Sequence, residues 1–180
     1  AQGEVDTARI RYSHQSAGVP GTVAGLALAH ARHGHLPWRQ LVEPAARMAR
    51  QGLVVDTELA QSLRNAHGHL APWPASRAIF LKADGSAYAP GDTLVQADLA
   101  ASLQQIAEHG PDAFYRGTIG QQLVADQQAH QGLISLDDLK NYRAIVREPV
   151  RGQYRGYTIV TMPPPSSGGV HLVQMLNILE

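Results

Sequence analysis

The 180-residue chain is long enough for one domain with its own core, and its 44% hydrophobic content excludes an intrinsically disordered protein. Its 15 basic residues balance its 15 acidic ones, so the chain has no basic excess that could hold a nucleic-acid backbone. Cysteine is absent, which excludes disulfides, thiolate zinc sites and a cysteine nucleophile. No apolar run reaches about 20 residues, so we expect no membrane span.

The first helix is expected only after a polar start. Residues 1–16 are polar, lack a secretion-signal pattern and are expected to be irregular. A helix is predicted over residues 20–34, because Pro20 can open it and Gly34 can close it. Its small apolar side chains favour close packing against another backbone, and an alanine-rich surface helix is the alternative.

Two more helices follow directly. One is predicted over residues 37–52, with Pro44 expected to kink or restart it. The apolar residues at helical spacing within it are Leu41, Ala45, Met48 and Ala49. The next helix is predicted over residues 57–65 with Asp56 as its cap, and its expected buried side consists of Leu59, Ala60 and Leu63.

The middle of the chain combines a turn with further helices. Asp84 and Gly85 form a turn signal between short apolar runs, which predicts a small hairpin. A helix is predicted over residues 99–109, with Asp98 as a cap and Gly110 as its end. Capping-box spacing occurs twice more, at Thr118 with Gln121 and at Ser135 with Asp138.

The last quarter of the chain changes to a strand pattern and then to a helix. Residues 142–146 and 157–162 are rich in β-branched and aromatic side chains, with turns expected at Gly152 and Gly156. A helix predicted over residues 170–179 is apolar nearly all round, so we expect it to be buried on every side.

The order of these elements predicts the fold class. Four to six helices, then strands, then one buried helix indicate an α+β fold, a mostly helical fragment with a few strands. The final helix reaches Glu180 with no glycine stop and no basic last turn. We therefore expect a cut, processed or partial chain.

Histidines are the first candidates for chemistry. They cluster in two short stretches, at His30, His33 and His35 and again at His67 and His69. Imidazole is a common metal ligand, but no Asp, Glu or Cys lies at matching spacing nearby. The helix dipole also favours positive charge in the last turn of a helix, where His30 and His33 are expected to lie. We therefore expect solvated histidines at helix ends and no metal site.

Paired carboxylates are the second candidates. Asp137 and Asp138 could suggest acid–base catalysis. They fall in the first turn of a predicted helix, where anions are stabilised. A role in stabilising the helix start is therefore favoured over catalysis for both carboxylates.

The loop "MPPPSSGG" supplies the remaining candidates, Ser166, Ser167, Gly168 and Gly169. A serine nucleophile needs a base and usually a G-x-S-x-G turn, and neither can be identified here. The start of the following helix could bind an anion, although no P-loop pattern follows. Proline stiffening with serine capping explains the same residue types. Capping is favoured over ligand binding, and these four residues remain the candidate substrate-binding positions.

Three long stretches of the chain resemble one family, the γ-glutamyltranspeptidases. They are "GVPGTVAGLALAHARHGHLPWRQLVEPAARMARQG", "GDTLVQADLAASLQQIAEHGPDAFYRGTIGQQLV" and "RGYTIVTMPPPSSGGVHLVQMLNILE". The likeness runs in order from about Ser13 to Glu180. It identifies residues 1–180 as part of a γ-glutamyltranspeptidase large subunit.

The resemblance implies an N-terminal nucleophile (Ntn) hydrolase with a four-layer αββα sandwich. Such a precursor cuts itself into a large and a small subunit. The new N-terminal threonine of the small subunit then attacks the γ-glutamyl amide of glutathione or a similar compound, with its own amine as base. The γ-glutamyl group passes to water, an amino acid or a peptide. The resemblance implies no cofactor, and it implies a periplasmic or secreted location.

The residues that perform this reaction have no counterpart here. The family's Thr-Thr-His-aromatic stretch does not occur, and no Arg-Glu-x-Ala-Pro motif is present, since Arg147 to Pro149 belongs to a different block. We therefore expect no catalytic residue in this chain and no activity from it alone. The alternatives are a non-catalytic helical interaction module and a serine hydrolase built on Ser166 or Ser167.

Overall fold

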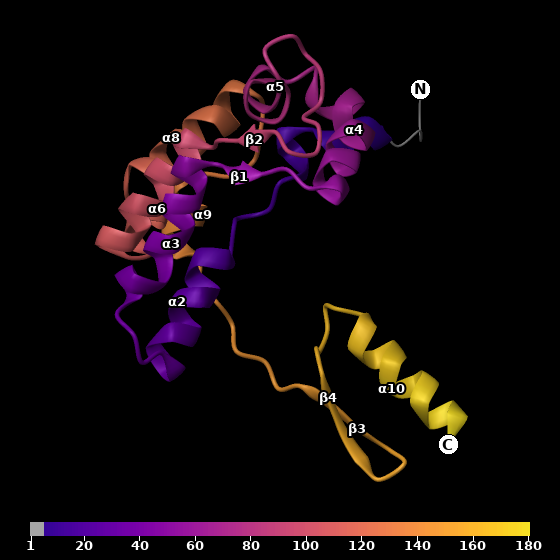
Figure 1. The fold of residues 1–180 in the computed structure, drawn as a ribbon. Helices are drawn as coiled ribbons and strands as arrows, with labels where there is room; N and C mark the ends of the chain where they lie inside the picture. Colours follow the sequence, from indigo (N-terminus) through magenta and orange to yellow (C-terminus); the bar gives the residue numbers. More distant parts are fainter. Residues whose placement is uncertain (1–5) are drawn as a thin grey trace. The chain divides into compact units, whose positions relative to one another are not determined.

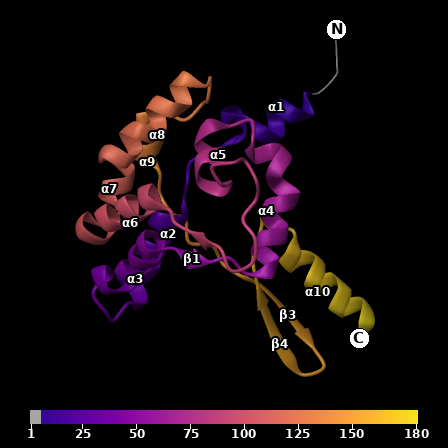
Figure 2. The same cartoon turned by 45° about the horizontal axis from the view of Figure 1, so that its top comes forward.

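The chain divides after Arg143 into two compact units. A computed structural model describes residues 6–180 (Figures 1 and 2). The described part of the N-terminal unit is almost entirely helical, and the C-terminal unit is a β-hairpin with one helix. The predicted fold class, mostly helical with small strand pairs, is confirmed.

The N-terminal unit contains ten helical segments and one short strand pair among its described residues. In chain order these are α1 (Thr7–Tyr12), η1 (His14–Ser16), α2 (Thr22–His33), α3 (Trp38–Gln51), β1 (Leu53–Val54), α4 (Thr57–Leu70), α5 (Pro74–Phe80), β2 (Thr93–Leu94), α6 (Ala97–His109), α7 (Asp112–Tyr115), α8 (Thr118–Ala129) and α9 (Leu136–Asn141).

The prediction of an irregular start is wrong for residues 7–16. The Asp6 carboxylate accepts the Arg9 backbone N–H at 3.0 Å and caps α1. Ser13 caps η1 in the same way through the Gln15 N–H. Short polar side chains therefore start two helical turns that lack a clear apolar stripe. Residues 1–5 of the same prediction lie outside the described residues.

Helices α3 and α6 form the main helix pair of this unit (Figure 1). The Trp38 indole N–H donates to the Ile106 carbonyl at 2.8 Å, and the Gln96 N–H donates to the Ala49 carbonyl at 2.9 Å. These bonds join the start of one helix to the end of the other, so the two helices run antiparallel. Strands β1 and β2 extend the pairing, with Leu53 opposite Leu94.

The expected restart of α3 at Pro44 is wrong. The helix continues past Pro44, because losing one hydrogen bond in a 14-residue helix packed along α6 does not end it. Of the four apolar residues noted at helical spacing, Ala49 is buried, whereas Leu41, Ala45 and Met48 are exposed; Ala46 is the other buried residue of the helix. Small side chains face α6 because they let the two helices approach closely.

Two clusters of buried side chains form the core. One contains Tyr115, Val124, Ile134 and Leu139, and the other contains Val55, Ala60 and Leu94. The Tyr115 hydroxyl donates to the Pro20 carbonyl at 2.7 Å and accepts the Ala24 N–H at 3.1 Å. These bonds hold the start of α2 against the first cluster. Helix α2 itself has no fully buried residue, so the closely packed helix predicted for it is only half-buried in this chain.

Two predicted helix caps are confirmed. Asp56 accepts the Leu59 N–H at 2.7 Å, and Ser135 forms a complete capping box with Asp138. Two others are wrong. Asp98 lies inside the first turn of α6, where Gln96 is the N-cap, and Thr118 follows the true N-cap of α8, Gly117.

The predicted hairpin around Asp84 and Gly85 is reduced to a tight turn. It closes on a single antiparallel bridge between Leu81 and Ala87, and residues 74–80 before it form helix α5. Strand β2 pairs with β1 instead.

The C-terminal unit pairs β3 (Val150–Tyr154) with β4 (Tyr157–Thr161) and ends with α10 (Gly168–Leu179). The turn at Gly156 is confirmed, since its φ of 83° suits glycine. Residues 142–146 form no strand, and Gly152 lies inside β3, so both of those predictions are wrong. A Cβ on Gly152 would lie 2.8 Å from Val173, so this glycine lets α10 pack on β3.

The expectation that α10 is buried on every side is wrong for this chain. Gly169 is its one buried residue, and its large exposed apolar side chains are Leu172, Met175, Ile178 and Leu179. Within the described residues, no helix has the length and apolar character needed to cross a membrane.

Candidate functional site

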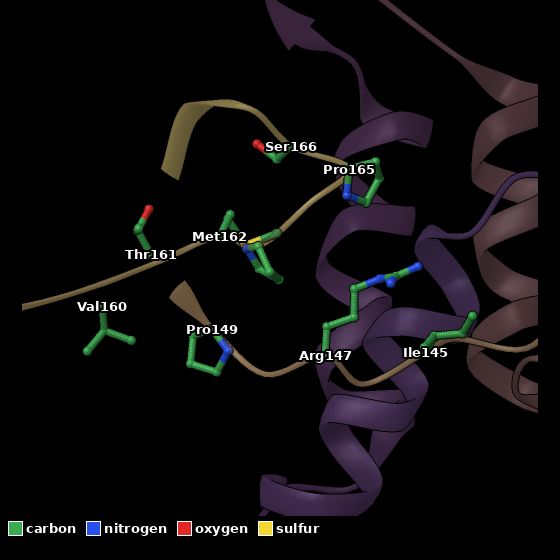
Figure 3. A pocket seen from close by; sticks show the side chains of 9 residues that line it. Ile145, Arg147, Pro149, Val160, Thr161, Met162, Pro165 and Ser166 are labelled. Atoms are coloured by element: carbon green, nitrogen blue, oxygen red, sulfur yellow. The ribbon is translucent and has the colours of Figure 1, made fainter. Parts of the chain in front are cut away.

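A cavity of about 730 Å³ lies in the C-terminal unit, beside the proline–serine loop (Figure 3). Its walls come from the segment that leads into β3 and from the end of β4 with the loop after it. The lining residues are Ile145, Arg147, Pro149, Val160, Thr161, Met162, Pro163, Pro165 and Ser166. Arg147 is the one charged side chain among them. The cavity therefore suits a ligand with an apolar part and a negatively charged group.

The hairpin register brings the two walls together. Val150, the first residue of β3, pairs with Thr161, the last residue of β4. The residues just before Val150 and just after Thr161 therefore leave the hairpin from the same end. Consecutive prolines stiffen the second of these segments.

Gly169 fixes where α10 begins. A Cβ at this position would overlap the Met162 carbonyl oxygen and lie 2.9 Å from the Thr161 side chain. At Gly168 the nearest atom to an added Cβ is the Ser166 hydroxyl oxygen, 3.8 Å away. Gly169 is therefore required for helix packing against β4, and its backbone is covered by Met162 and Thr161. It does not line the cavity.

Of the four predicted loop candidates, only Ser166 lines the cavity. Ser167 occupies the N-cap position of α10 with φ −79° and ψ −21°, and its hydroxyl makes no capping bond. An N-cap side chain reaches the helix N–H groups from an extended backbone, which Ser167 does not have. The expected serine cap is therefore wrong.

Residues 9–180 contain no hydroxyl–histidine pair of the kind that activates a serine nucleophile. Among residues 9–180, no serine or threonine hydroxyl hydrogen-bonds a histidine. A serine nucleophile at Ser166 or Ser167 would need such a base within hydrogen-bond reach.

The predicted histidine candidates serve other contacts. His30 Nε2 bonds the Leu36 carbonyl at 2.8 Å, and His67 Nε2 bonds the Gly85 carbonyl at 2.9 Å. The His69 ring stacks on Tyr12. His33 and His35 are exposed. These histidines do not converge with carboxylates.

A different histidine group was missed by sequence reasoning. His14 and His130 both contact Asp126, which precedes His130 by four residues. The spacing of Asp126 and His130 on one helix face is a readable signal. His14, 112 positions from Asp126, could not be linked to them without the fold.

Asp138 has the structural role that was predicted. Its Oδ2 accepts the Ser135 hydroxyl at 2.6 Å and the Ser135 N–H at 2.9 Å. These hydrogen bonds lower the pKa of the Asp138 carboxyl, because they favour its charged form. Asp138 therefore belongs to a helix cap.

The sequence matches the family model for gamma-glutamyltranspeptidase over residues 2–180. The glutathione hydrolase proenzyme of Escherichia coli (strain K12) is 48% identical over 180 residues, which cover 99% of this chain. The acylase ACY 1 proenzyme of Pseudomonas sp. (strain SE83) is 48% identical over 162 residues, 90% of this chain. The chain spans 31% and 29% of the lengths of these two relatives.

A solved structure matches the fold over nearly the whole chain. The crystal structure of Helicobacter pylori gamma-glutamyltranspeptidase aligns with a TM-score of 0.95 and 38% identity. The alignment covers 99% of this chain and 51% of that chain. The likeness therefore extends to both units described above.

Proposed function

Because this chain belongs to the gamma-glutamyltranspeptidase family, we propose that it is a large-subunit segment of an enzyme that cleaves γ-glutamyl amides. Glutathione is the representative substrate, and the γ-glutamyl group passes to water, an amino acid or a peptide. The observation that carries this proposal is the family match over residues 2–180. The 48% identity to a glutathione hydrolase proenzyme supports the choice of substrate.

In this proposal the segment contributes no catalytic residue. The nucleophile is a threonine at the N-terminus of a small subunit cut from the same precursor, and the amine of that threonine acts as its base. The lack of a hydroxyl–histidine hydrogen bond among residues 9–180 supports this division of roles. The reaction requires no cofactor.

The segment supplies structure for the rest of the enzyme. The hairpin β3–β4 and helix α10 become part of the αββα sandwich, and the apolar side chains of α10 pack against the remainder of the precursor. The exposure of Leu172, Met175 and Ile178 supports this role, since a large apolar patch marks an interaction surface. The family resemblance favours a periplasmic or secreted location.

An assay with a γ-glutamyl anilide tests the proposal. The 180-residue chain should release no amine above background, whereas the longer natural protein that contains it should release amine steadily. Turnover by the chain alone that survives repurification and disappears in Ser166→Ala or Ser167→Ala would favour a serine hydrolase instead. A longer protein without turnover would contradict the proposed activity.

The acylase relative supports a second candidate substrate class. Its identity to this chain equals that of the glutathione hydrolase proenzyme, at 48%. A parent with acylase activity would cleave amides whose acyl group is not γ-glutamyl. Assaying the longer protein on a matched pair of anilides, one γ-glutamyl and one a dicarboxylic acyl group without the α-amine, separates the two. We expect faster release from the γ-glutamyl compound.

A further inference from the structure

Three metal-ligating side chains converge at the end of α8. His14 comes from η1, Asp126 from the last turn of α8, and His130 from the residue that ends that helix. One ligand atom from each lies within 4.8 Å of the others. We propose that His14, Asp126 and His130 bind a divalent transition metal ion of the zinc type.

The carboxylate is shared between the two imidazoles. His14 Nε2 lies 2.9 Å from Asp126 Oδ2, and His130 Nδ1 lies 3.2 Å from Asp126 Oδ1. Two ligand atoms of a tetrahedral zinc ion are about 3.3 Å apart, given metal–ligand bonds of about 2.0–2.1 Å. The two nitrogen–oxygen separations are therefore close to those of ligands around one ion. His130 Nδ1 also bonds the Asp126 backbone carbonyl oxygen at 2.9 Å, and this hydrogen bond is given up when the metal binds through Nδ1.

Small ring movements can bring the ligand nitrogens of His14 and His130 closer together. They are stacked, with centroids 4.3 Å apart and planes 13° apart. The His130 side chain is 47% exposed, so its ring has room to turn about its side-chain torsions. His14 is the more enclosed partner at 21% exposure, and the edge of its ring meets Trp73. His14 therefore holds its position, and His130 can turn toward the ion when it binds.

A cavity beside the three ligands would leave a coordination position of the bound ion open. A space of about 330 Å³ adjoins the three ligands and is also lined by Trp73, Pro74, Ala75 and Ser76. This is room enough for a water molecule on the metal. Two imidazoles and a carboxylate without thiolate suit zinc and its neighbours in the first transition series.

A bound ion would join two parts of the N-terminal unit that are far apart in sequence. His14 and Asp126 are separated by 112 residues, and their mutual contact is exposed. An exposed ion pair contributes little on its own. A bound metal would replace this weak contact with coordinate bonds that link η1 to α8. Because the three ligands come together only in the folded state, metal binding would stabilise that state.

Titration calorimetry with zinc chloride tests the proposal on protein stripped with a chelator. We expect one ion per chain at this site. His130→Ala and Asp126→Asn should each weaken binding by at least about tenfold, which is the scale on which ligand support changes metal affinity. His171→Ala is the matched control, because His171 is exposed and lies in the C-terminal unit. It should bind zinc as tightly as the unchanged protein.

Cobalt(II) gives a second readout that does not depend on stability. The unchanged protein should develop the visible absorption of a low-symmetry cobalt site, and His130→Ala and His14→Gln should not. Circular dichroism in chelator checks that each variant is folded. No zinc binding, or equal binding by the unchanged protein and all three ligand variants, would overturn the assignment.

Discussion

The two units differ in how their apolar side chains are covered. In the N-terminal unit, Val55, Leu94 and Leu139 are each at most 3% exposed and belong to continuous clusters. In the C-terminal unit, Ile178 is 82% exposed, and Gly169 is the one buried residue of α10. The comparison indicates that the first unit carries its own core. In the second unit, Gly152 and Gly169 let α10 pack closely on the hairpin. In our proposal, the rest of the enzyme covers the apolar side chains of α10 that are exposed here.

The largest predicted effect breaks the core of the N-terminal unit. Leu139→Ala removes a fully buried side chain from the cluster around Tyr115 and should lower the free energy of unfolding by about 2–5 kcal/mol. Leu136→Ala, in the same helix but 50% exposed, is the control and should change stability little. Chemical denaturation of both variants makes the comparison. Equal losses would show that α9 does not contribute to the core through Leu139.

The next prediction concerns the C-terminal unit. Gly169→Ala places a methyl group against the Met162 carbonyl and the Thr161 side chain, so α10 must shift. We expect a loss of about 1–3 kcal/mol, the usual range for overpacking. Gly168→Ala is the matched control one residue earlier, where an added methyl is in ordinary contact. Thermal melting compares the stability of the two variants. If Gly168→Ala were as unstable as Gly169→Ala, close packing at Gly169 would not explain the loss.

The smallest effect is a pH dependence at α9. Hydrogen bonds from Ser135 lower the pKa of Asp138 below its usual value of 3.8. A group whose pKa is lower in the folded state stabilises the fold above its unfolded pKa. That contribution is lost as the pH falls from 3.8 through the lower folded value.

Melting curves between neutral and acid pH check this sign. Asp138→Asn should remove part of the acid dependence, and Asp137→Asn, in the same helical turn but outside the capping box, should remove less of it. Identical acid profiles for Asp138→Asn and the unchanged protein would contradict the assignment.

Local chemistry predicted the elements that local interactions determine. Asp56 and Ser135 cap helices within three residues of their own positions, and Gly156 turns a hairpin whose strands are adjacent. Residues 142–146 have strand-forming side chains but no neighbouring strand to pair with, so they form no strand.

Tertiary packing decided what local chemistry could not. Alanines of α3 face α6 because close approach outweighs the burial of Leu41 and Met48 in this chain. The convergence of His14 on Asp126 depends on the path of the chain over 112 residues, and no sequence spacing encodes it. Of the candidate loop, sequence identified Ser166 as a possible binding residue, but only the hairpin register brings it to a cavity.

Amide hydrogen exchange tests the central contrast most directly. It is measured on the 180-residue chain and on the longer precursor to which we propose it belongs. We predict that amides of α3 and α6 are protected in both, and that amides of α10 are protected strongly only in the longer protein. Equal, strong protection of α10 in both would contradict the account, because that helix would then need no partner to cover it.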